Sequence, residues 1–486
     1  NTIAQGAVDS TMLCTVNLPA SGKQTVYLVI GAGFAYEDLL ELQRFVHRHM
    51  PQGVIDRTTS YWRLWLAANR AQFPAAGEGG PSEKISDLYK RSLLLVRSQI
   101  DDGGAIIAAN DSDVMQFSRD TYSYMWPRDG ALVANALDGA GFPDVSRNFY
   151  KFCEKIIVDA GFFLHKYNPD GSAASSWHPW VSLGKPQIPI QEDETALVVW
   201  ALWKHFAIYR DIEFVRTTWS SLICRAGDFL VRFRDPDTHL PLPSYDLWEE
   251  RWGVHAYTVA TVYAGLKAAW EFAVCFGDDR RAARYGQAAS QMREAFCRYM
   301  WSGELNRFFR RIVPLDHDRT ARLMDEVISG RDPLPEGQTV GGHEMAKVMG
   351  QSEMGAESSG YVPEFEYDST LDSSLLGISA FGLLPVHDER VRKTMDAVSD
   401  GLWVRTPVGG MARYEGDTYY RMCEDEGVPG NPWFICTLWL ADYHIARALS
   451  VADLTEALPI LEWVADRALP SGVLAEQVHP HTNAPL

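Results

Sequence analysis

Apolar positions follow two different patterns, which divide the chain near residue 82. Residues 10–32 alternate apolar and polar side chains in two runs around a turn, which predicts two strands. The stretches 37–49 and 57–73 are amphipathic with helical spacing. Residues 74–81 are rich in Pro and Gly, as is typical of a linker. Because a lone hairpin is not stable by itself, we expect these strands to pair with strands outside this sequence or to pack on the helices that follow.

Beyond residue 82, apolar residues recur at helical spacing almost to the end of the chain. Val254–Phe272 and Ala196–Trp203 are apolar on nearly every side, which predicts buried helices, whereas Asp279–Met300 is amphipathic. Alternating buried and half-exposed helices are typical of an α/α barrel, in which outer helices surround an inner ring. We expect helices near 84–100, 128–140, 144–160, 191–209, 212–233, 254–276, 280–300, 319–329, 371–382, 388–400, 431–449 and 454–468.

Composition narrows the classes of partner. The 45 Lys and Arg against 63 Asp and Glu give a net charge of −18, so neither nucleic acid nor an anionic membrane is an expected partner. No apolar run approaches the roughly 18–20 residues that span a bilayer. The first residues lack a start Met and a signal pattern, so we expect that a preceding segment was removed or not included. The seven scattered Cys favour free thiols and a cytoplasmic location.

The 16 Trp, 20 Tyr and 21 Phe suit a protein that binds carbohydrate, because sugar C–H faces lie on aromatic rings and sugar hydroxyls donate to carboxylates. Motifs for other chemistries are missing from the sequence, which has no H-E-x-x-H, no Walker loop and no G-x-S-x-G. The 13 His show no metal-ligand spacing. We therefore expect no metal and no cofactor.

Two clusters join acidic and aromatic residues ahead of predicted helices. In the first, Arg128 and Asp129 follow Trp126 and could grip neighbouring hydroxyls of one sugar ring. Alternatively, Asp129 caps the helix and pairs with Arg128. In the second, Glu249 and Glu250 lie between two Trp residues. An indole raises the pKa of an adjacent carboxyl, as a general acid requires, but a helix N-terminus also favours acids.

Five segments resemble the glucoamylase family of glycoside hydrolases, family 15, and most closely its prokaryotic branch: Asp120–Ala136, Trp177–Leu202, Ser244–Thr258, Gly409–Trp439 and Gly472–Gln477. The resemblance implies a mainly α protein with an (α/α)6-barrel catalytic domain at 83–486. It also implies a helical linker at 36–82 and the remnant of an N-terminal β-sandwich at 1–35. Family members continue further beyond the last of these segments, so we expect the barrel to be truncated at its C-terminus.

The resemblance also implies roles for individual residues. Glu249 matches the general acid, and Glu476 matches the general base that activates water. Arg128 and Asp129 match the pair that holds the non-reducing glucose. The remaining expected substrate-binding residues are Tyr122 near the developing positive charge, Arg413 and Glu250 near the leaving sugar, Trp126, Trp248 and Trp433 around the pocket, and Trp177 or Trp180 on the aglycone side.

The mechanism of that family is a single displacement with inversion, which needs carboxyl groups about 6.5–9.5 Å apart. We therefore expect release of β-D-glucose from the non-reducing ends of starch and malto-oligosaccharides. Other substrates within the family, isomaltose, dextran or trehalose, remain open. So do an inverting disaccharide phosphorylase, in which phosphate replaces water, and a catalytically inactive glycan-binding barrel. Oligomeric state is not predicted.

Overall fold

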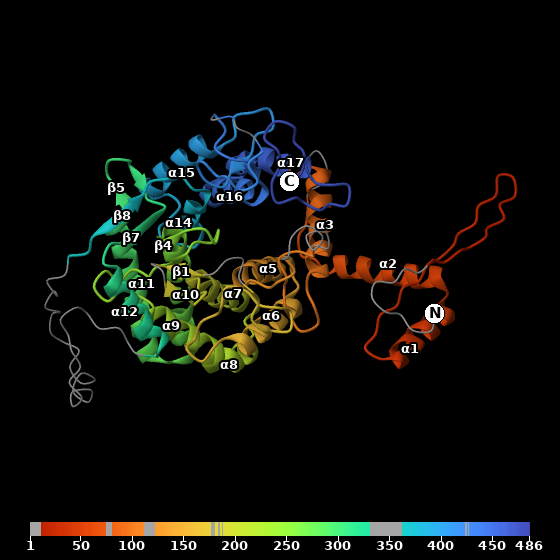
Figure 1. Cartoon of the computed structure of the whole chain (residues 1–486), viewed down its shortest axis with the longest axis horizontal. Helices are drawn as coiled ribbons and strands as arrows, with labels where there is room; N and C mark the ends of the chain where they lie inside the picture. The colour runs from red at the N-terminus through yellow and green to blue at the C-terminus, as the bar shows by residue number, and fades with distance from the viewer. Residues whose placement is uncertain are drawn as a thin grey trace. The chain divides into compact units, whose positions relative to one another are not determined.

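The computed structural model describes residues 11–73, 80–110, 122–175, 180–182, 185–186, 188–330, 362–422, 425 and 427–486. Its contacts group the chain into two compact units, Asn1–Ala67 and Ala68–Leu486 (Figure 1). The boundary between the two units therefore falls inside the helical linker predicted at 36–82. The division into a sandwich remnant, a linker and a barrel domain stays a prediction.

The first unit contains two helices, α1 (Tyr36–His49) and α2 (Pro51–Ala67), neither of which has a buried residue. The helix expected at 37–49 is confirmed, whereas α2 begins and ends about six residues before the range expected for it. Pro51 suits the first helical position because its φ is already helical and no N–H is lost. The two strands expected at 10–32 do not form in the described residues, where 11–35 are almost entirely exposed. The described part of that segment contains no other strand with which they could pair.

The second unit is built around an inner set of helices: α5 (Pro127–Ala140), α7 (Glu192–Tyr209), α10 (Ala256–Phe276), the short pair η2 (Ser373–Leu376) and α14 (Gly377–Ala380), and α16 (Phe434–Arg447). They pack in chain order, α5 on α7, α7 on α10, α10 on α14 and α14 on α16. The α7–α10 contact is closest at Gly265, where an added Cβ would meet Ala196 at 2.9 Å. A larger residue there would force the two helices apart.

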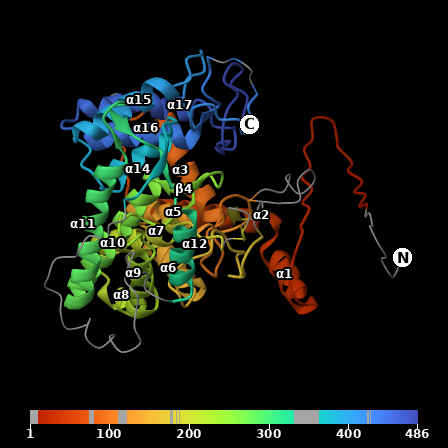
Figure 2. The same ribbon diagram turned by 60° about the vertical axis from the view of Figure 1, so that its left-hand side comes forward.

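Amphipathic helices surround this set, as predicted. They are α3 (Glu83–Ser98), α6 (Pro143–Ile156), α8 (Ile212–Thr218), η1 (Trp219–Cys224), α9 (Arg225–Arg232), α11 (Asp279–Tyr299), α12 (His317–Ile328), α15 (Glu389–Leu402), η3 (Asp453–Ala457) and α17 (Leu458–Ala465). The range 212–233 is nearly continuous helix, but its middle, η1, is π-helical. Along the chain, each inner helix is followed by one or more outer helices, which is the pattern of an α/α barrel (Figures 1 and 2).

Short antiparallel strands, which the periodicity did not predict, join the helices at the loops. One sheet has the order β3 (Ser244–Tyr245), β4 (Trp252–His255), β7 (Arg311–Pro314) and β8 (Phe365–Asp368). The others are β1 (Val181–Ser182) with β2 (Lys185–Pro186), β5 (Trp301–Ser302) with β6 (Arg307–Phe308), and β9 (Met411–Ala412) with β10 (Pro432–Trp433). The helix expected from 254 therefore begins at 256, because the preceding residues pair with β3 and β7.

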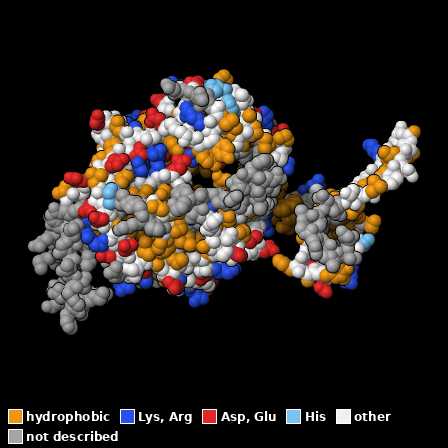
Figure 3. Space-filling model, viewed as in Figure 1, with side chains coloured by type: hydrophobic (Ala, Val, Ile, Leu, Met, Phe, Trp, Pro, Cys, Tyr) orange, Lys and Arg blue, Asp and Glu red, His pale blue; other side chains and the backbone are white. Residues whose placement is uncertain are grey.

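The expectation that no apolar run approaches the length of a membrane span was wrong. By length and composition α10 could cross a membrane, with a mean hydropathy of 1.3 in its most apolar window, and 67% of that window is buried inside the protein. Its apolar side chains pack against α7 and α11 in the core of the barrel. On the face shown in Figure 3, acidic, basic and hydrophobic side chains are interspersed.

Candidate active site

The loops that precede α5, α7, α10 and α16 meet at one end of the inner set. Three of these loops or first turns carry residues that the sequence singled out, Arg128, Glu249 and Trp433, and the first turn of α7 carries Asp193. Hydrogen bonds and ring contacts tie these segments together, although they are far apart in the sequence. The site is therefore a product of the barrel, which brings the beginnings of its inner helices to the same end.

Arg128 is held by the first turn of α7. Its Nη1 lies 2.9 Å from Asp193 Oδ2 and 3.2 Å from Glu194 Oε1, and its backbone N–H donates to Glu194. Asp129 lies further away, with its Oδ2 at 3.6 Å from Arg128 Nε, and its side chain is 42% exposed. Trp126 occupies the N-cap position of α5. Asp129 therefore does not cap the helix, although it keeps a long ion pair with Arg128, and its carboxylate stays accessible.

The Asp193 and Glu194 carboxylates were not given a role from the sequence. Both are fully buried, and Asp193 and Glu194 together supply the charge that Arg128 needs in a buried position. Three consecutive acids at the start of an otherwise apolar helix could have indicated a buried cation nearby, because buried acids require a partner. Glu192, the first of the three, is also buried, and burial raises its pKa to about 8.

Glu249 lies in the tight turn between β3 and β4, outside any helix. Its backbone N–H donates to the Asp246 carbonyl at 2.9 Å, and its φ of 58° places it in the left-handed region. Asp246 Oδ1 accepts the next two backbone N–H groups, at 2.8 and 3.1 Å, which fixes the turn. Because α10 begins only at Ala256, the view that this acid simply favours a helix N-terminus is wrong.

The Glu249 carboxyl faces Trp126. Trp126 Nε1 donates to Oε1 at 2.8 Å, and Oε2 lies 3.9 Å from His165 Nε2. Burial raises the pKa of Glu249 above its ordinary value, against the opposing effects of Arg128, the Trp126 hydrogen bond and Lys166. The carboxyl therefore retains a proton at higher pH than a solvated glutamate does.

Glu250 points to a different set of partners. Its Oε1 accepts from Arg413 Nη2 at 2.7 Å, and its Oε2 accepts from the Tyr414 hydroxyl. Arg413 also forms two bonds to Asp417, at 2.9 and 2.8 Å. The guanidinium lies over the rings of Trp248 and Trp433, with centroid distances of 5.2 and 4.9 Å. Asp417, four residues after Arg413, was given no role from the sequence.

Glu476 is held beside the start of α16. Its carbonyl accepts from the Phe434 N–H at 3.3 Å, and the next residue, Gln477, pairs with Trp433 in an isolated bridge. Asn431 Nδ2 donates to Gln477 Oε1 at 2.8 Å. Burial raises the pKa of Glu476, with Asp417 and Asp129 adding to the rise and Arg413 opposing it. The charges of Asp129, Asp417 and Arg413 therefore all act on the Glu476 carboxyl.

Tyr122 connects the two glutamates. Its hydroxyl lies 3.0 Å from the Tyr419 hydroxyl. Burial and that hydrogen bond raise its pKa, and the negative charges of Glu476 and Glu249 both add to the rise. Both carboxyls thus act on one phenol, although one comes from a loop in the middle of the barrel sequence and the other from a loop near its end.

Aromatic rings form the walls of the site. Trp126 lies 6.1 Å from Tyr122, Trp248 lies 6.1 Å from Trp433, and Trp180 packs at 4.8 Å on the His165 ring, all between centroids. The buried Nε1 of Trp433 has no hydrogen-bond partner in the described part of the chain. Trp177 lies outside the described residues. Within those residues, no group of three His, Cys, Asp or Glu is arranged to hold a metal ion.

Sequence reasoning also missed His165 and Lys166, which lie on the loop after α6 and are 1% exposed. Lys166 Nζ lies 4.6 Å from the Tyr124 ring centroid and 5.3 Å from that of Trp126. No local pattern marks these residues. Taken together, the site contains two carboxyls of raised pKa, a fixed guanidinium, accessible acceptors and several aromatic rings. These groups are suited to bind a neutral sugar and to transfer protons to and from it.

Comparisons with known proteins agree with this chemistry. The family model described as glycosyl hydrolases family 15 matches residues 83–483. An uncharacterized glycosyl hydrolase of Methanocaldococcus jannaschii is 26% identical, over 90% of this chain and 58% of its own length. A glucoamylase of Clostridium sp. is 22% identical, over 83% and 50% of the two lengths. An isomaltose glucohydrolase of Kribbella flavida is 24% identical, over 82% and 84%.

Among solved structures, a bacterial glucoamylase complexed with acarbose superposes with a TM-score of 0.63 and 18% identity. The match covers 92% of this chain and 57% of that one. This likeness confirms the predicted (α/α)6-barrel fold. The chain spans little more than half the length of the first relatives and of this structure.

Proposed function

Because the chain belongs to glycosyl hydrolases family 15, as the motifs predicted, we propose that it is a glucoamylase-like, exo-acting, inverting α-glucosidase. In this proposal it releases β-D-glucose from the non-reducing ends of starch and malto-oligosaccharides. The observation that carries the proposal is the placement of Glu249 and Glu476. Both carboxyls have a raised pKa, come from separate loops, and act on the same phenol, that of Tyr122.

Glu249 is the general acid in this mechanism. Its Oε1 accepts the Trp126 N–H, so Oε2 is the oxygen that carries the proton. That proton passes to the glycosidic oxygen as the bond from this oxygen to the anomeric carbon breaks. The Trp126 hydrogen bond and the nearby Arg128 and Lys166 charges stabilise the carboxylate that remains.

Glu476 is the general base. It accepts a proton from a water molecule as the water oxygen bonds to the anomeric carbon from the opposite face. The raised pKa makes its carboxylate a stronger base than an ordinary glutamate, provided that the pH lies above that pKa. Attack on the opposite face inverts an α-glucoside into β-glucose.

The Arg128–Asp129 pair supports recognition of one glucose ring. The guanidinium is fixed by Asp193 and Glu194, while the Asp129 carboxylate is accessible and can accept hydroxyl protons. The Clostridium relative, named a glucoamylase, supports starch as the substrate. The Kribbella relative, named an isomaltose glucohydrolase, supports α-1,6-linked glucose as a second candidate.

The test is glucose release from maltose, maltotriose, isomaltose and trehalose by the 486-residue chain, with the product anomer followed by NMR. The proposal expects β-glucose first and faster turnover of maltotriose than of isomaltose. An α-anomer as first product would contradict inversion, and preference for isomaltose would favour the second candidate. A rate that requires phosphate would indicate a phosphorylase. No release by the wild type and no effect of Glu249→Gln would indicate an inactive glycan-binding barrel.

A further inference from the structure

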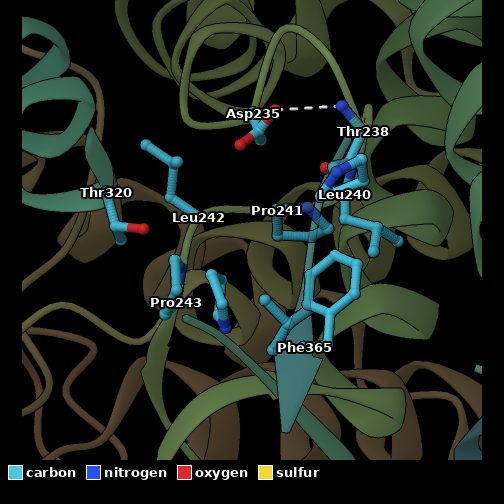
Figure 4. Close-up of a pocket in the computed structure, with 11 residues that line it drawn as sticks. Asp235, Thr238, Leu240, Pro241, Leu242, Pro243, Thr320 and Phe365 are labelled. Carbon is cyan, nitrogen blue, oxygen red and sulfur yellow. Dashed lines mark hydrogen bonds between the residues drawn. The ribbon is translucent and has the colours of Figure 1, made fainter. Parts of the chain in front are cut away.

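The cavity drawn in Figure 4 lies outside the candidate active site, between the residues around Asp235 and the beginning of β8. Asp235 accepts the Thr238 N–H there, at 2.9 Å. The volume of the cavity is about 10 Å³, which is room for a single water molecule and not for a sugar. This cavity therefore offers no second site for a substrate.

Inside the candidate active site, His165 is a buried polar residue that has no part in the proposed mechanism. It is 1% exposed and lies on the loop after α6. Its backbone N–H donates to the Pro189 carbonyl at 3.0 Å, and two residues later Tyr167 pairs with Met125 through two hydrogen bonds of 2.9 Å. The loop is thus bound both to the residue ahead of Trp126 and to the segment that leads into α7. The backbone of His165 is therefore fixed.

A series of ring contacts joins His165 to the turn that carries the acid. Its imidazole packs on Trp180 with the centroids 4.8 Å apart, and Trp180 packs edge-on against Tyr245 at 4.6 Å. Trp180 is itself buried, with 6% exposure. Tyr245 ends strand β3, four residues ahead of Glu249. The imidazole is therefore held by rings as well as by its backbone, on the side where we expect the leaving sugar.

The two oxygens of the Glu249 carboxyl face different side chains. Oε1 accepts the Trp126 N–H at 2.8 Å, whereas Oε2 lies 3.9 Å from His165 Nε2. An N–H···O hydrogen bond is about 2.9 Å long, so a movement of about 1 Å would close the second pair. Nε2 can donate when the ring is protonated, and also when the ring is neutral with its hydrogen on that nitrogen. His165 is therefore placed to bind the carboxyl oxygen that Trp126 does not bind.

We propose that His165 is a positioning residue for Glu249, an inference that rests on the proposed function. It keeps Oε2 directed at the glycosidic oxygen. The proton passes from Oε2 to that oxygen, which also takes the electron pair of its bond to the anomeric carbon. The Nε2–H group then donates to Oε2, which has become negative, while Trp126 still binds Oε1. The carboxylate is thereby stabilised at both oxygens, and the hydrogen on Nε2 is not itself transferred.

The test compares two substrates that differ in their need for an acid. The leaving sugar of maltose must be protonated, whereas fluoride leaves from α-glucosyl fluoride without a proton from the enzyme. Both substrates still need the base Glu476 and the same binding of the glucose ring. A residue that acts through Glu249 should therefore affect kcat on maltose and spare kcat on α-glucosyl fluoride. Glu249→Gln is the reference variant and should separate the two substrates most strongly.

His165→Asn and His165→Gln form a matched pair. Both lose the ring and its contact with Trp180, but only the longer glutamine side chain brings an amide N–H to the position of Nε2. We expect His165→Asn to lower kcat on maltose about tenfold to a hundredfold, and His165→Gln about threefold. Both variants should hydrolyse α-glucosyl fluoride within about threefold of the wild-type rate, and KM for maltose should change less than kcat.

His165→Phe keeps a ring against Trp180 but has no nitrogen, so it guards against a loss of folding in the other two variants. It should behave like His165→Asn, with a melting temperature close to that of the wild type. His444→Phe is the control, because His444 also meets a glutamate and a ring: its Nδ1 lies 2.9 Å from Glu456 Oε2, and its centroid lies 6.0 Å from that of Tyr443. It belongs to the last turn of α16, remote from the site, and the variant should keep both rates.

Two results would overturn the role of His165. Equal losses on the two substrates by folded variants would mean that His165 serves packing alone, and an unchanged kcat on maltose would exclude it altogether. The reference variant tells these results from a failure of the proposed function. If Glu249→Gln does not separate the substrates, the proposed function fails and this inference fails with it. If Glu249→Gln separates them and no His165 variant does, only the role of His165 is overturned.

Discussion

The indole N–H of Trp126 donates to Glu249 Oε1 at 2.8 Å, so the residue that ends one loop fixes the carboxyl of another loop 123 positions along the chain. This bond does two things to Glu249. It occupies one carboxyl oxygen, which leaves the other for the transferred proton. It also stabilises the ionised form and so limits the rise in the pKa of Glu249 that burial causes.

Replacing Trp126 with Phe should therefore raise the pKa of Glu249 further, because the carboxylate formed on proton transfer loses a stabilising hydrogen bond. We expect kcat on maltotriose to fall about tenfold to a hundredfold, and the alkaline limb of the pH profile to move to higher pH. Trp219→Phe, outside the site, is the control and should change neither. A slower enzyme with an unmoved alkaline limb would mean that Trp126 serves packing alone.

The base Glu476 should set the opposite limb. Glu476 must be ionised to accept a proton. Because burial raises its pKa above the ordinary 4.5, activity should rise as the pH rises through this raised pKa. Glu476→Gln cannot accept the proton and should lower kcat by about 10²- to 10⁴-fold. The acidic limb should disappear in the residual rate. Glu250→Gln is a neighbouring control that should keep the acidic limb, and its loss there would argue against Glu476 as the base.

Substitutions of Arg128 and Asp129 should have different effects on the free energy of unfolding, although both residues belong to the candidate active site. Arg128→Leu leaves the buried Asp193 and Glu194 carboxylates without their partner and should lower the free energy of unfolding by about 3–5 kcal/mol. Asp129→Asn changes an accessible carboxylate 3.6 Å from the guanidinium and should leave stability within about 0.5 kcal/mol. Urea unfolding and maltose kinetics measure both. Asp129→Asn should nonetheless lose most of its activity, and a fully active variant would exclude Asp129 from substrate binding.

Glu192 should make stability depend on pH. Burial raises its pKa to about 8, so the folded state binds this proton more tightly than the unfolded state, whose pKa is about 4.5. Its contribution is complete below about pH 4.5 and is lost as the pH rises towards 8. Glu192→Gln removes this dependence. Compared with the wild type, the variant should gain on the order of a few kcal/mol between pH 5 and pH 8 in urea unfolding. An unchanged difference between the two proteins at both pH values would contradict the shift.

Local patterns were enough to place most helices. The spacing of apolar residues predicted α7 and α10, because a helix buried on several sides requires apolar residues around its whole circumference. Turn and strand residues were less informative. The strand pair β3–β4 is only a few residues long, and β4 also pairs with β7, whose residue Ile312 lies 58 positions after its partner Val254. The alternation at 10–32 predicted strands, but the described part of that segment has no neighbouring strand with which to pair.

The sequence by itself determined the helical periodicity, the order of the motifs and the acids and rings that the site uses, because these are properties of neighbouring residues. It left open which residues other than Asp129 hold Arg128 and whether Glu249 belongs to a helix. Tertiary structure decided both, by placing Asp193 and Glu194 against Arg128 and by folding Glu249 into a turn that faces Trp126. Such partners are set by closure of the barrel. Burial then fixes the charge states, since a carboxyl responds to whatever the fold places around it.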